Sequence, residues 1–286
     1  MKLSQARFAL LLLIVVVAFS GCGVINRIRS KNELNEAART YREGHFAEAE
    51  QHSKRAMELD PDNKTAPSFV ARTIHAQYKP GNETPENVAK AREAIEAYKQ
   101  MMEKNPNSKE AEEAYKAIAA LYGAIKEEDT QRQWIMQRAN SNDAKPEQRA
   151  EAWVVLASKD WNCSFQITEL PASKQVVKEG NKALIVYKKP PDQKDYDQAH
   201  ACVQRGLEEA EKAISFDPTN ESAWSYKTNL LREAAKLAEM DGKTEDKDKL
   251  SKQAEEAQQQ TTKLSEENQK KKEAQEAQKQ PAKKAD

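Results

Sequence analysis

The sequence is poor in glycine, cysteine and aromatic residues, and it carries no net charge. Its 286 residues include 8 glycines and 3 cysteines, and aromatic residues make up 6%. Lysine and arginine total 46, as do aspartate and glutamate. This balance leaves no overall basic excess to attract nucleic acid. Because alanine, glutamate, lysine and glutamine dominate instead, the composition favours a helical array over a sheet protein.

The chain also lacks the short motifs of common catalytic and phosphate-binding sites. It contains no G-x-S-x-G, H-E-x-x-H, G-x-x-x-x-G-K or G-x-G-x-x-G pattern. Its four histidines are scattered, and only His200 lies close to a cysteine, Cys202. No spacing supplies further ligands to that pair. We therefore predict a protein that is not an enzyme, with no metal and no cofactor.

The most informative segment is the N-terminal one. Lys2 and Arg7 precede an unbroken apolar run, 8–19. The run ends at Phe19, and the small residues Ser20, Gly21 and Cys22 follow it. A basic start, a short apolar core and a small-residue exit are typical of a secretory signal. With a cysteine directly after the exit, the segment resembles a bacterial lipoprotein signal, which implies that Cys22 is acylated.

Two alternatives to lipidation at Cys22 stay open. The apolar run is shorter than the roughly 18–20 residues of a spanning helix. Val24 and Ile25 extend it, however, so an uncleaved anchor is one alternative and ordinary cleavage is the other. Gly23 is not the Asp that marks inner-membrane retention in this family. The resemblance therefore implies an outer-membrane lipoprotein facing the periplasm, with inner-membrane anchoring as the alternative.

A repeated pattern of small residues and prolines follows the signal. Ala49 and Ala56 precede Pro61 by the distances at which Gly206 and Ala213 precede Pro218. Small side chains let two helices approach closely, and proline cannot continue a helix. This spacing resembles the tetratricopeptide repeat, a unit of about 34 residues with two antiparallel helices. The resemblance implies an all-α fold, an α-solenoid of about five helix pairs.

The repeats divide the chain into four segments. We expect a signal peptide at 1–21, a membrane-proximal linker at 22–31, the repeat array at 32–242 and a charged tail at 243–286, partly helical and partly disordered. The helix pairs are expected to begin near Asn32, Lys64, Lys109, Pro146 and Glu221.

The fourth pair is expected to carry a long insertion, 163–195. Two β-prone runs, 175–178 and 183–187, flank a Gly-Asn turn and predict a small hairpin, with a short helix or a loop as the alternative. Cys163 and Cys202 bound this insertion. In an oxidising compartment two remaining cysteines tend to bond, so we expect a disulfide between them, with two buried thiols as the alternative.

Resemblance to the tetratricopeptide family also implies a groove lined by first-helix side chains. Carrying the groove positions over gives seven candidates for contact with a partner: Tyr41, Arg72, His75, Ser158, Trp161, Asn229 and Arg232. Tyr41 and Trp161 would act as aromatic anchors, and the arginines would grip carboxylates. The alternative is that these residues only fill contacts between helices.

Together these patterns predict a periplasm-facing lipoprotein scaffold that binds a protein or peptide partner in the cell envelope, in assembly or secretion. Its contact with the membrane would be the lipid anchor, and nucleic acid is not an expected partner. The alternative is an envelope enzyme or ligand carrier in which the insertion 163–195 forms a pocket.

Overall fold

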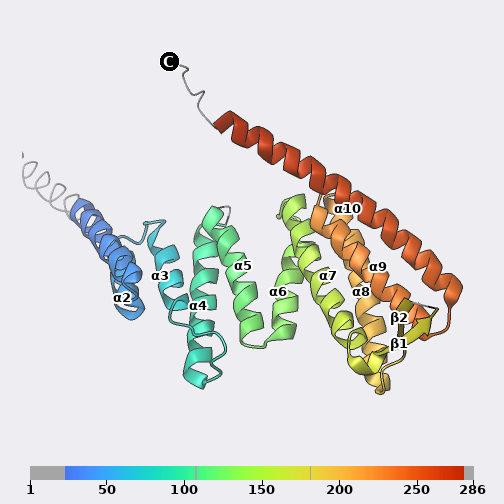
Figure 1. Ribbon diagram of the computed structural model, residues 1–286. Coiled ribbons are helices and arrows are strands. Elements are labelled where there is room, and N and C mark those ends of the chain that lie inside the picture. The colour runs from blue at the N-terminus through green and yellow to red at the C-terminus, as the bar shows by residue number, and fades with distance from the viewer. Residues whose placement is uncertain (1–22, 107, 181, 280–286) are drawn as a thin grey trace, which may run out of the picture. The chain divides into compact units, whose positions relative to one another are not determined.

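The computed structural model describes residues 23–106, 108–180 and 182–279, and within them it is almost entirely helical (Figure 1). Helices follow one another as five antiparallel pairs, so the expected all-α, tetratricopeptide-like class is confirmed. After a helical segment at 23–42, the helices are α2 (Phe46–Leu59), α3 (Ala66–His75), α4 (Pro85–Lys104), α5 (Lys109–Ala124), α6 (Glu128–Asn140), α7 (Pro146–Thr168), α8 (Gln193–Phe216), α9 (Glu221–Met240) and α10 (Thr244–Lys279).

The chain forms two compact units, which divide within α6 between Gln131 and Arg132. In the first unit, neighbouring helices from α2 to α5 pack in sequence order. In the second unit, α9 contacts α7, α8 and α10. Each unit is described separately below.

Alanine fills the contacts between the helices. Among the described residues, fifteen alanines are wholly buried: Ala37, Ala49, Ala56, Ala66, Ala71, Ala91, Ala94, Ala114, Ala139, Ala150, Ala157, Ala199, Ala210, Ala213 and Ala223. Where α8 packs against α9, a Cβ added to Gly206 would lie 2.6 Å from a methyl carbon of Leu230. Small side chains at these positions therefore set how closely the helices pack.

The first helix begins earlier than expected. Residues 23–31, expected to be a linker, are helical and continuous with the segment that ends at Arg42. Ser30 is fully buried, and its hydroxyl donates a hydrogen bond of 2.9 Å to the carbonyl oxygen of Ala56 in α2. This contact shows that the segment before Asn32 packs against the array.

The insertion folds as the expected hairpin. A short 3-10 helix, η1 (Pro171–Ser173), leads into β1 (Lys174–Glu179), which pairs antiparallel with β2 (Lys182–Tyr187). Gly180 adopts a φ of +59° in the turn, a conformation that glycine adopts without a steric penalty.

The insertion is shorter than the expected 163–195, because α7 continues to Thr168. Ser164 and Thr168 are both fully buried in this last part of α7. Their hydroxyls donate hydrogen bonds of 3.1 and 2.7 Å to Oε2 of Glu233 in α9. The segment between helices is therefore 169–192, since α8 begins at Gln193.

The charged tail forms a long helix whose first part packs on the array. α10 lies beside α9 in Figure 1, and Ala254 and Ala257 are buried against Leu231. Leu250 packs against the same cluster. The tail is therefore the second helix of the fifth pair, and its small residues supply the contact.

A disulfide joins Cys163 in α7 to Cys202 in α8, as expected. The two Cα atoms lie 6.2 Å apart, and 39 positions separate the residues in sequence. The bond closes the loop that carries the hairpin and ties together the two helices of the fourth pair.

Two sequence expectations fall outside the described residues, namely the signal peptide at 1–21 and the acylated Cys22. Among the helices that the structure describes, none has the length and apolar content needed to cross a bilayer.

Removing the disulfide should lower the stability of the second unit. Closing a loop of this length restricts the unfolded chain by about 4 kcal/mol in the chain-entropy account. We expect Cys163→Ala/Cys202→Ala to melt at a lower temperature than the wild type, measured by circular dichroism. A reductant should lower the wild-type melting temperature and leave the variant unchanged. An equal response of both proteins to reductant would contradict this role.

Candidate functional site

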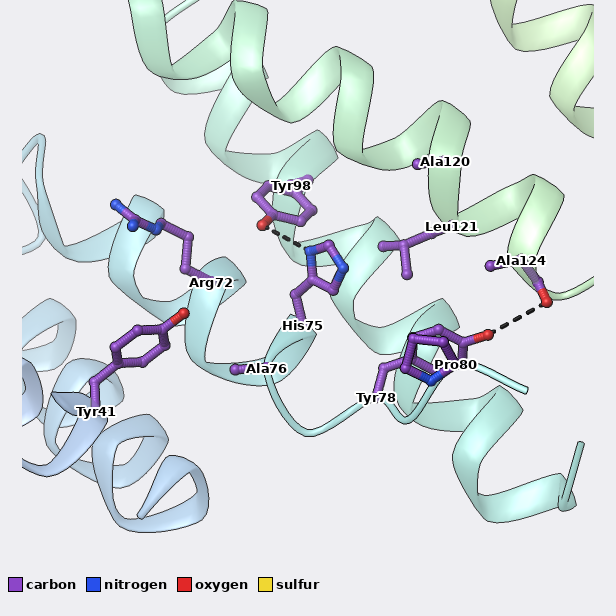
Figure 2. Close-up of a pocket in the computed structure, with 10 residues that line it drawn as sticks. All are labelled: Tyr41, Arg72, His75, Ala76, Tyr78, Pro80, Tyr98, Ala120, Leu121 and Ala124. Atoms are coloured by element: carbon purple, nitrogen blue, oxygen red, sulfur yellow. Dashed lines mark hydrogen bonds between the residues drawn. The ribbon is translucent and has the colours of Figure 1, made fainter. Parts of the chain in front are cut away.

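A pocket with a volume of about 440 Å³ opens on the first unit (Figure 2). Its walls come from the end of the first helical segment, from α3 and the turn after it, and from α4 and α5. Ten residues line it: Tyr41, Arg72, His75, Ala76, Tyr78, Pro80, Tyr98, Ala120, Leu121 and Ala124. The pocket thus combines apolar and aromatic walls with one permanently charged side chain, that of Arg72.

A neutral hydrogen-bonded pair forms the polar centre of the pocket. Nδ1 of His75 lies 3.1 Å from the hydroxyl oxygen of Tyr98 (Figure 2). Burial lowers the pKa of His75, and burial raises the pKa of Tyr98 to about 12. Both groups are therefore uncharged at neutral pH. In either tautomer of His75, Nε2 stays available to a ligand as a donor or an acceptor.

Arg72 and Tyr41 stand at the edge of the pocket. Arg72 is exposed, and among the described residues its guanidinium makes no hydrogen bond or ion pair. Tyr41 is half-buried, with its ring 5.2 Å from that of Phe46, and its hydroxyl points toward Arg72 in Figure 2. A free guanidinium beside an aromatic ring suits a carboxylate that is attached to an apolar group.

The turn after α3 closes one side of the pocket. The Tyr78 hydroxyl donates a hydrogen bond of 3.3 Å to the carbonyl oxygen of Ala124 at the end of α5. Asn87 fixes the same turn, since its side chain accepts a bond from the amide of Lys79 and donates one to the carbonyl of Lys79. The lengthened turn is therefore held in place as a wall.

The structure brings together three of the seven predicted groove residues, Tyr41, Arg72 and His75. The groove pattern missed the remaining lining, which comes from a second helix (Tyr98), from the turn (Tyr78 and Pro80) and from the next pair. The unusual length of the turn was the only sequence signal for these residues.

Ser158 and Trp161 lie on α7 in the second unit, outside the pocket. The Ser158 hydroxyl donates a hydrogen bond of 2.7 Å to the carbonyl of Val155 in its own helix. The half-buried ring of Trp161 packs 5.1 Å from Phe165 and 6.0 Å from Tyr226 in α9. Trp161 therefore contributes to contact between helices.

Asn229 and Arg232 lie on α9. Asn229 is half-buried, whereas Arg232 is exposed and donates a hydrogen bond of 3.3 Å to Oε1 of Gln258 in α10. Arg232 also lines a pocket of about 290 Å³ whose other walls include α10 residues. The second helix of the fifth pair, α10, therefore lies beside Arg232.

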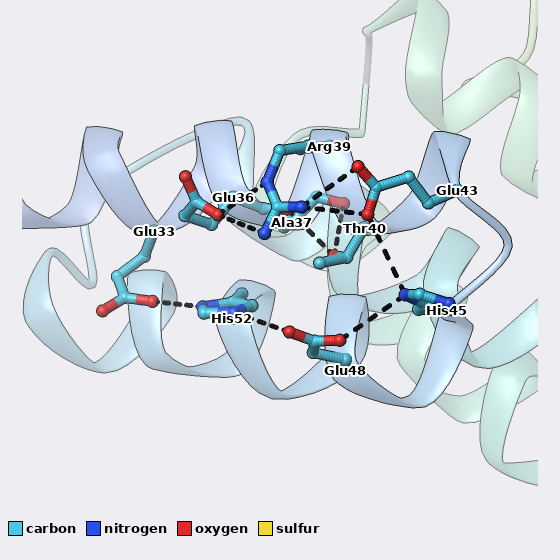
Figure 3. Close-up of polar contacts among 9 residues, drawn as sticks. All are labelled: Glu33, Glu36, Ala37, Arg39, Thr40, Glu43, His45, Glu48 and His52. Carbon is cyan, nitrogen blue, oxygen red and sulfur yellow. Dashed lines mark hydrogen bonds and ion pairs between the residues drawn. The ribbon is translucent and has the colours of Figure 1, made fainter.

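Polar contacts fasten the first helical segment to α2 (Figure 3). Nδ1 of His52 lies 2.7 Å from a carboxylate oxygen of Glu33, and Nε2 lies 3.9 Å from Glu48. His45 lies 3.7 Å from the same Glu48 carboxylate. Within the described residues no group of three or more histidine, cysteine, aspartate or glutamate side chains could hold a metal. We therefore interpret this network as a contact between two helices.

The second unit also carries a pocket of about 650 Å³ that includes His200. Its lining comes from α8, α9 and α10 and from Asp241 and Lys243 between the last two. Cys163 and residues 169–192 line none of the three described pockets.

A buried cluster of charges joins three helices in the second unit. Arg132 of α6 lies 3.2 Å from Asp160 of α7, and Arg205 of α8 lies 2.9 Å from the same carboxylate. Arg132 also binds Glu209 of α8, whose second oxygen is buried and has no hydrogen-bond donor in the described part of the chain.

The environment of Glu209 disfavours its charge. Burial raises the pKa of Glu209 to about 7, and the neighbouring Asp160 carboxylate adds to the rise against the opposing charge of Arg132. Because the cluster lies between packed helices and lines none of the three pockets, we interpret it as part of the packing.

No protein-family model matches the chain, and no curated protein matches it. Among solved structures, MamA 41-end from Desulfovibrio magneticus RS-1 is 13% identical with a TM-score of 0.39, covering 84% of this chain and 96% of that one. The TPR2AB-domain:pHSP90-complex of yeast Sti1 is 16% identical with a TM-score of 0.32, covering 82% and 98%. Because both TM-scores are low, the fold is assigned from the helix pairs of this chain alone.

The Glu209 environment predicts that stability falls as pH rises. Since the folded pKa exceeds the unfolded one, the native state binds more protons between about pH 4.5 and pH 7, and stability is lost over that range. We expect Glu209→Gln to reduce the difference between melting temperatures at about pH 5 and about pH 8. Glu208→Gln, at the exposed neighbouring position, is the matched control. Equal pH dependence in wild type and Glu209→Gln would contradict the prediction.

Proposed function

We propose that this chain is a non-enzymatic scaffold that binds a protein partner through the pocket of its first unit. The observation that carries the proposal is the convergence of Tyr41, Arg72 and His75 on one pocket, as the repeat register predicted. Apolar walls can bury a partner side chain, while Arg72 supplies a charge that is not neutralised within the described chain.

The partner segment is expected to carry an apolar side chain close to a carboxylate. Tyr41, Tyr78, Tyr98 and Leu121 surround the space that an apolar group would fill. The guanidinium at the edge would then pair with the carboxylate, and Nε2 of His75 would bond a backbone or side-chain polar atom. A short extended peptide meets these requirements.

A photo-crosslinking experiment tests the pocket directly. A photoreactive amino acid at Ala76, which lines the pocket, should form an adduct with the partner in intact cells. The same group at Gln100, exposed on α4, should not form it. Arg72→Glu should remove most of the Ala76 adduct because it reverses the charge at the pocket edge.

Arg55→Glu is the matched control, because Arg55 is exposed in the same unit and pairs only with Glu58 in its own helix. Circular dichroism should show unchanged helicity in both variants. The proposal fails if Arg72→Glu leaves the adduct intact, or if Gln100 yields the same adduct as Ala76.

The location belongs to the same proposal: an acylated Cys22 holds the scaffold at the outer membrane, facing the periplasm, in envelope assembly or secretion. The basic start, the apolar run and the Ser20-Gly21-Cys22 exit support it. The Cys163–Cys202 disulfide is consistent with an oxidising compartment.

Replacing Cys22 tests the anchor. Cys22→Ala should lose incorporation of a labelled fatty acid, and its distribution between membrane and soluble fractions should change, because acylation depends on the cysteine thiol. Cys163→Ala/Cys202→Ala should keep the label, which controls for the loss of cysteine in general. Absence of label from the wild-type protein would refute the anchor.

A further inference from the structure

The hairpin of the second unit presents large apolar side chains to solvent. Val176 and Ile185 are 67% and 57% exposed, and they face each other as a cross-strand pair. Leu184, opposite Val177, is 40% exposed on the other face, because successive side chains of a strand point to opposite faces. Lys178 lies two positions after Val176 and so shares the face of the Val176–Ile185 pair. Exposed aliphatic side chains on one small element are typical of an interaction surface.

The base of the hairpin is firmly held, so the exposed part is displayed on a fixed support. The Tyr187 hydroxyl donates a hydrogen bond of 3.0 Å to Glu169, which also accepts one of 2.7 Å from Lys236 of α9. On the other side, Lys189 forms an ion pair of 2.9 Å with Asp241, at the end of α9. These contacts fix the end of β2 to the helices.

The hairpin is also strongly basic, although the whole chain has no net charge. Residues 174–189 contain five lysines and one acidic residue, Glu179, a net charge of +4. Lys174 and Lys189 pair with Glu169 and Asp241 at the base. Lys178 and Lys188 are exposed and make no side-chain hydrogen bond or ion pair within the described residues.

An exposed apolar pair beside free lysines matches the interface of an anionic bilayer. Valine and isoleucine enter the acyl boundary, while long lysine side chains reach the phosphate groups. A protein segment added to a strand edge is the competing occupant, but lysines along an edge strand act against such pairing. The charge and the Val176–Ile185 pair therefore favour a lipid surface.

We propose that the 174–189 hairpin is a membrane-contact element that binds anionic lipid surfaces through the Val176–Ile185 pair and the lysines Lys178 and Lys188. This contact requires neither the pocket of the first unit nor an acyl chain on Cys22. It would give the second unit its own attachment to a bilayer.

Vesicle flotation tests the proposal with the chain from Gly23 to Asp286, which contains every described residue and no lipid attachment site. We expect binding to vesicles of phosphatidylcholine with about 30% phosphatidylglycerol, and little binding to phosphatidylcholine alone. Lys178→Glu/Lys188→Glu should weaken partitioning at least about tenfold, since each lysine near an anionic surface contributes about 1 kcal/mol. Lys64→Glu/Lys252→Glu, at exposed positions outside the hairpin, should leave it unchanged.

A second variant tests whether the Val176–Ile185 pair enters the bilayer. Val176→Trp should shift its fluorescence to shorter wavelength when anionic vesicles are added. Val155→Trp, at a position 43% exposed on α7, should not. Circular dichroism should confirm that both variants stay folded.

Three results would overturn the proposal. The first is wild-type binding that does not differ between anionic and neutral vesicles. The second is equal binding by wild type and Lys178→Glu/Lys188→Glu. The third is a Val176→Trp shift that grows with protein concentration in the absence of vesicles, which would assign the surface to a second copy of the chain.

Discussion

The close approach of helices at small side chains is the constraint on which this structure depends. Buried alanines occupy the crossings in both units, and between α8 and α9 only Gly206 leaves room for Leu230. Larger buried side chains such as Ile74, Ile95 and Ile118 fill the core beside these contacts. The aromatic residues Tyr41, Tyr78 and Tyr98 line the pocket of the first unit. The same packing recruits the polar tail, whose Ala254 and Ala257 meet Leu231.

The two units present surfaces of different chemistry. The first combines apolar walls, a neutral His75–Tyr98 pair and the unpaired Arg72, which suits a peptide with a carboxylate. In the second unit, the buried carboxylates of Asp160 and Glu209 pair with arginines between packed helices. The same unit carries a basic hairpin with exposed apolar side chains, whose base is bonded to the helices. A scaffold with one surface for a protein and another for a bilayer follows from these two proposals.

Sequence patterns predicted most of the fold because the repeat has a physical spacing. Alanines and prolines such as Ala49 and Pro61 mark where helices cross and end, so the five pairs, the hairpin and the disulfide could be placed. Features that depend on tertiary contacts were missed. Residues 23–31 of the expected linker are helical and pack on α2 through Ser30, and α7 runs to Thr168, where Glu233 accepts hydrogen bonds from Ser164 and Thr168. In the site, Tyr41, Arg72 and His75 could be predicted from register. Tyr98 and Leu121 could not, since they reach the pocket from other positions of the repeat. The position of Gln258 of α10 beside Arg232 could not be predicted either, since nothing local in the sequence indicates it.

Hydrogen–deuterium exchange on the chain with its captured partner tests the central claim most directly. If the pocket of the first unit is the binding surface, amide exchange should slow in 72–80 and 120–124, the segments that carry Arg72, His75, Tyr78 and Leu121. Exchange in the α7 and α9 segments that carry Ser158, Trp161, Asn229 and Arg232 should stay unchanged. Slowed exchange confined to the second unit, with none in 72–80 or 120–124, would contradict the account.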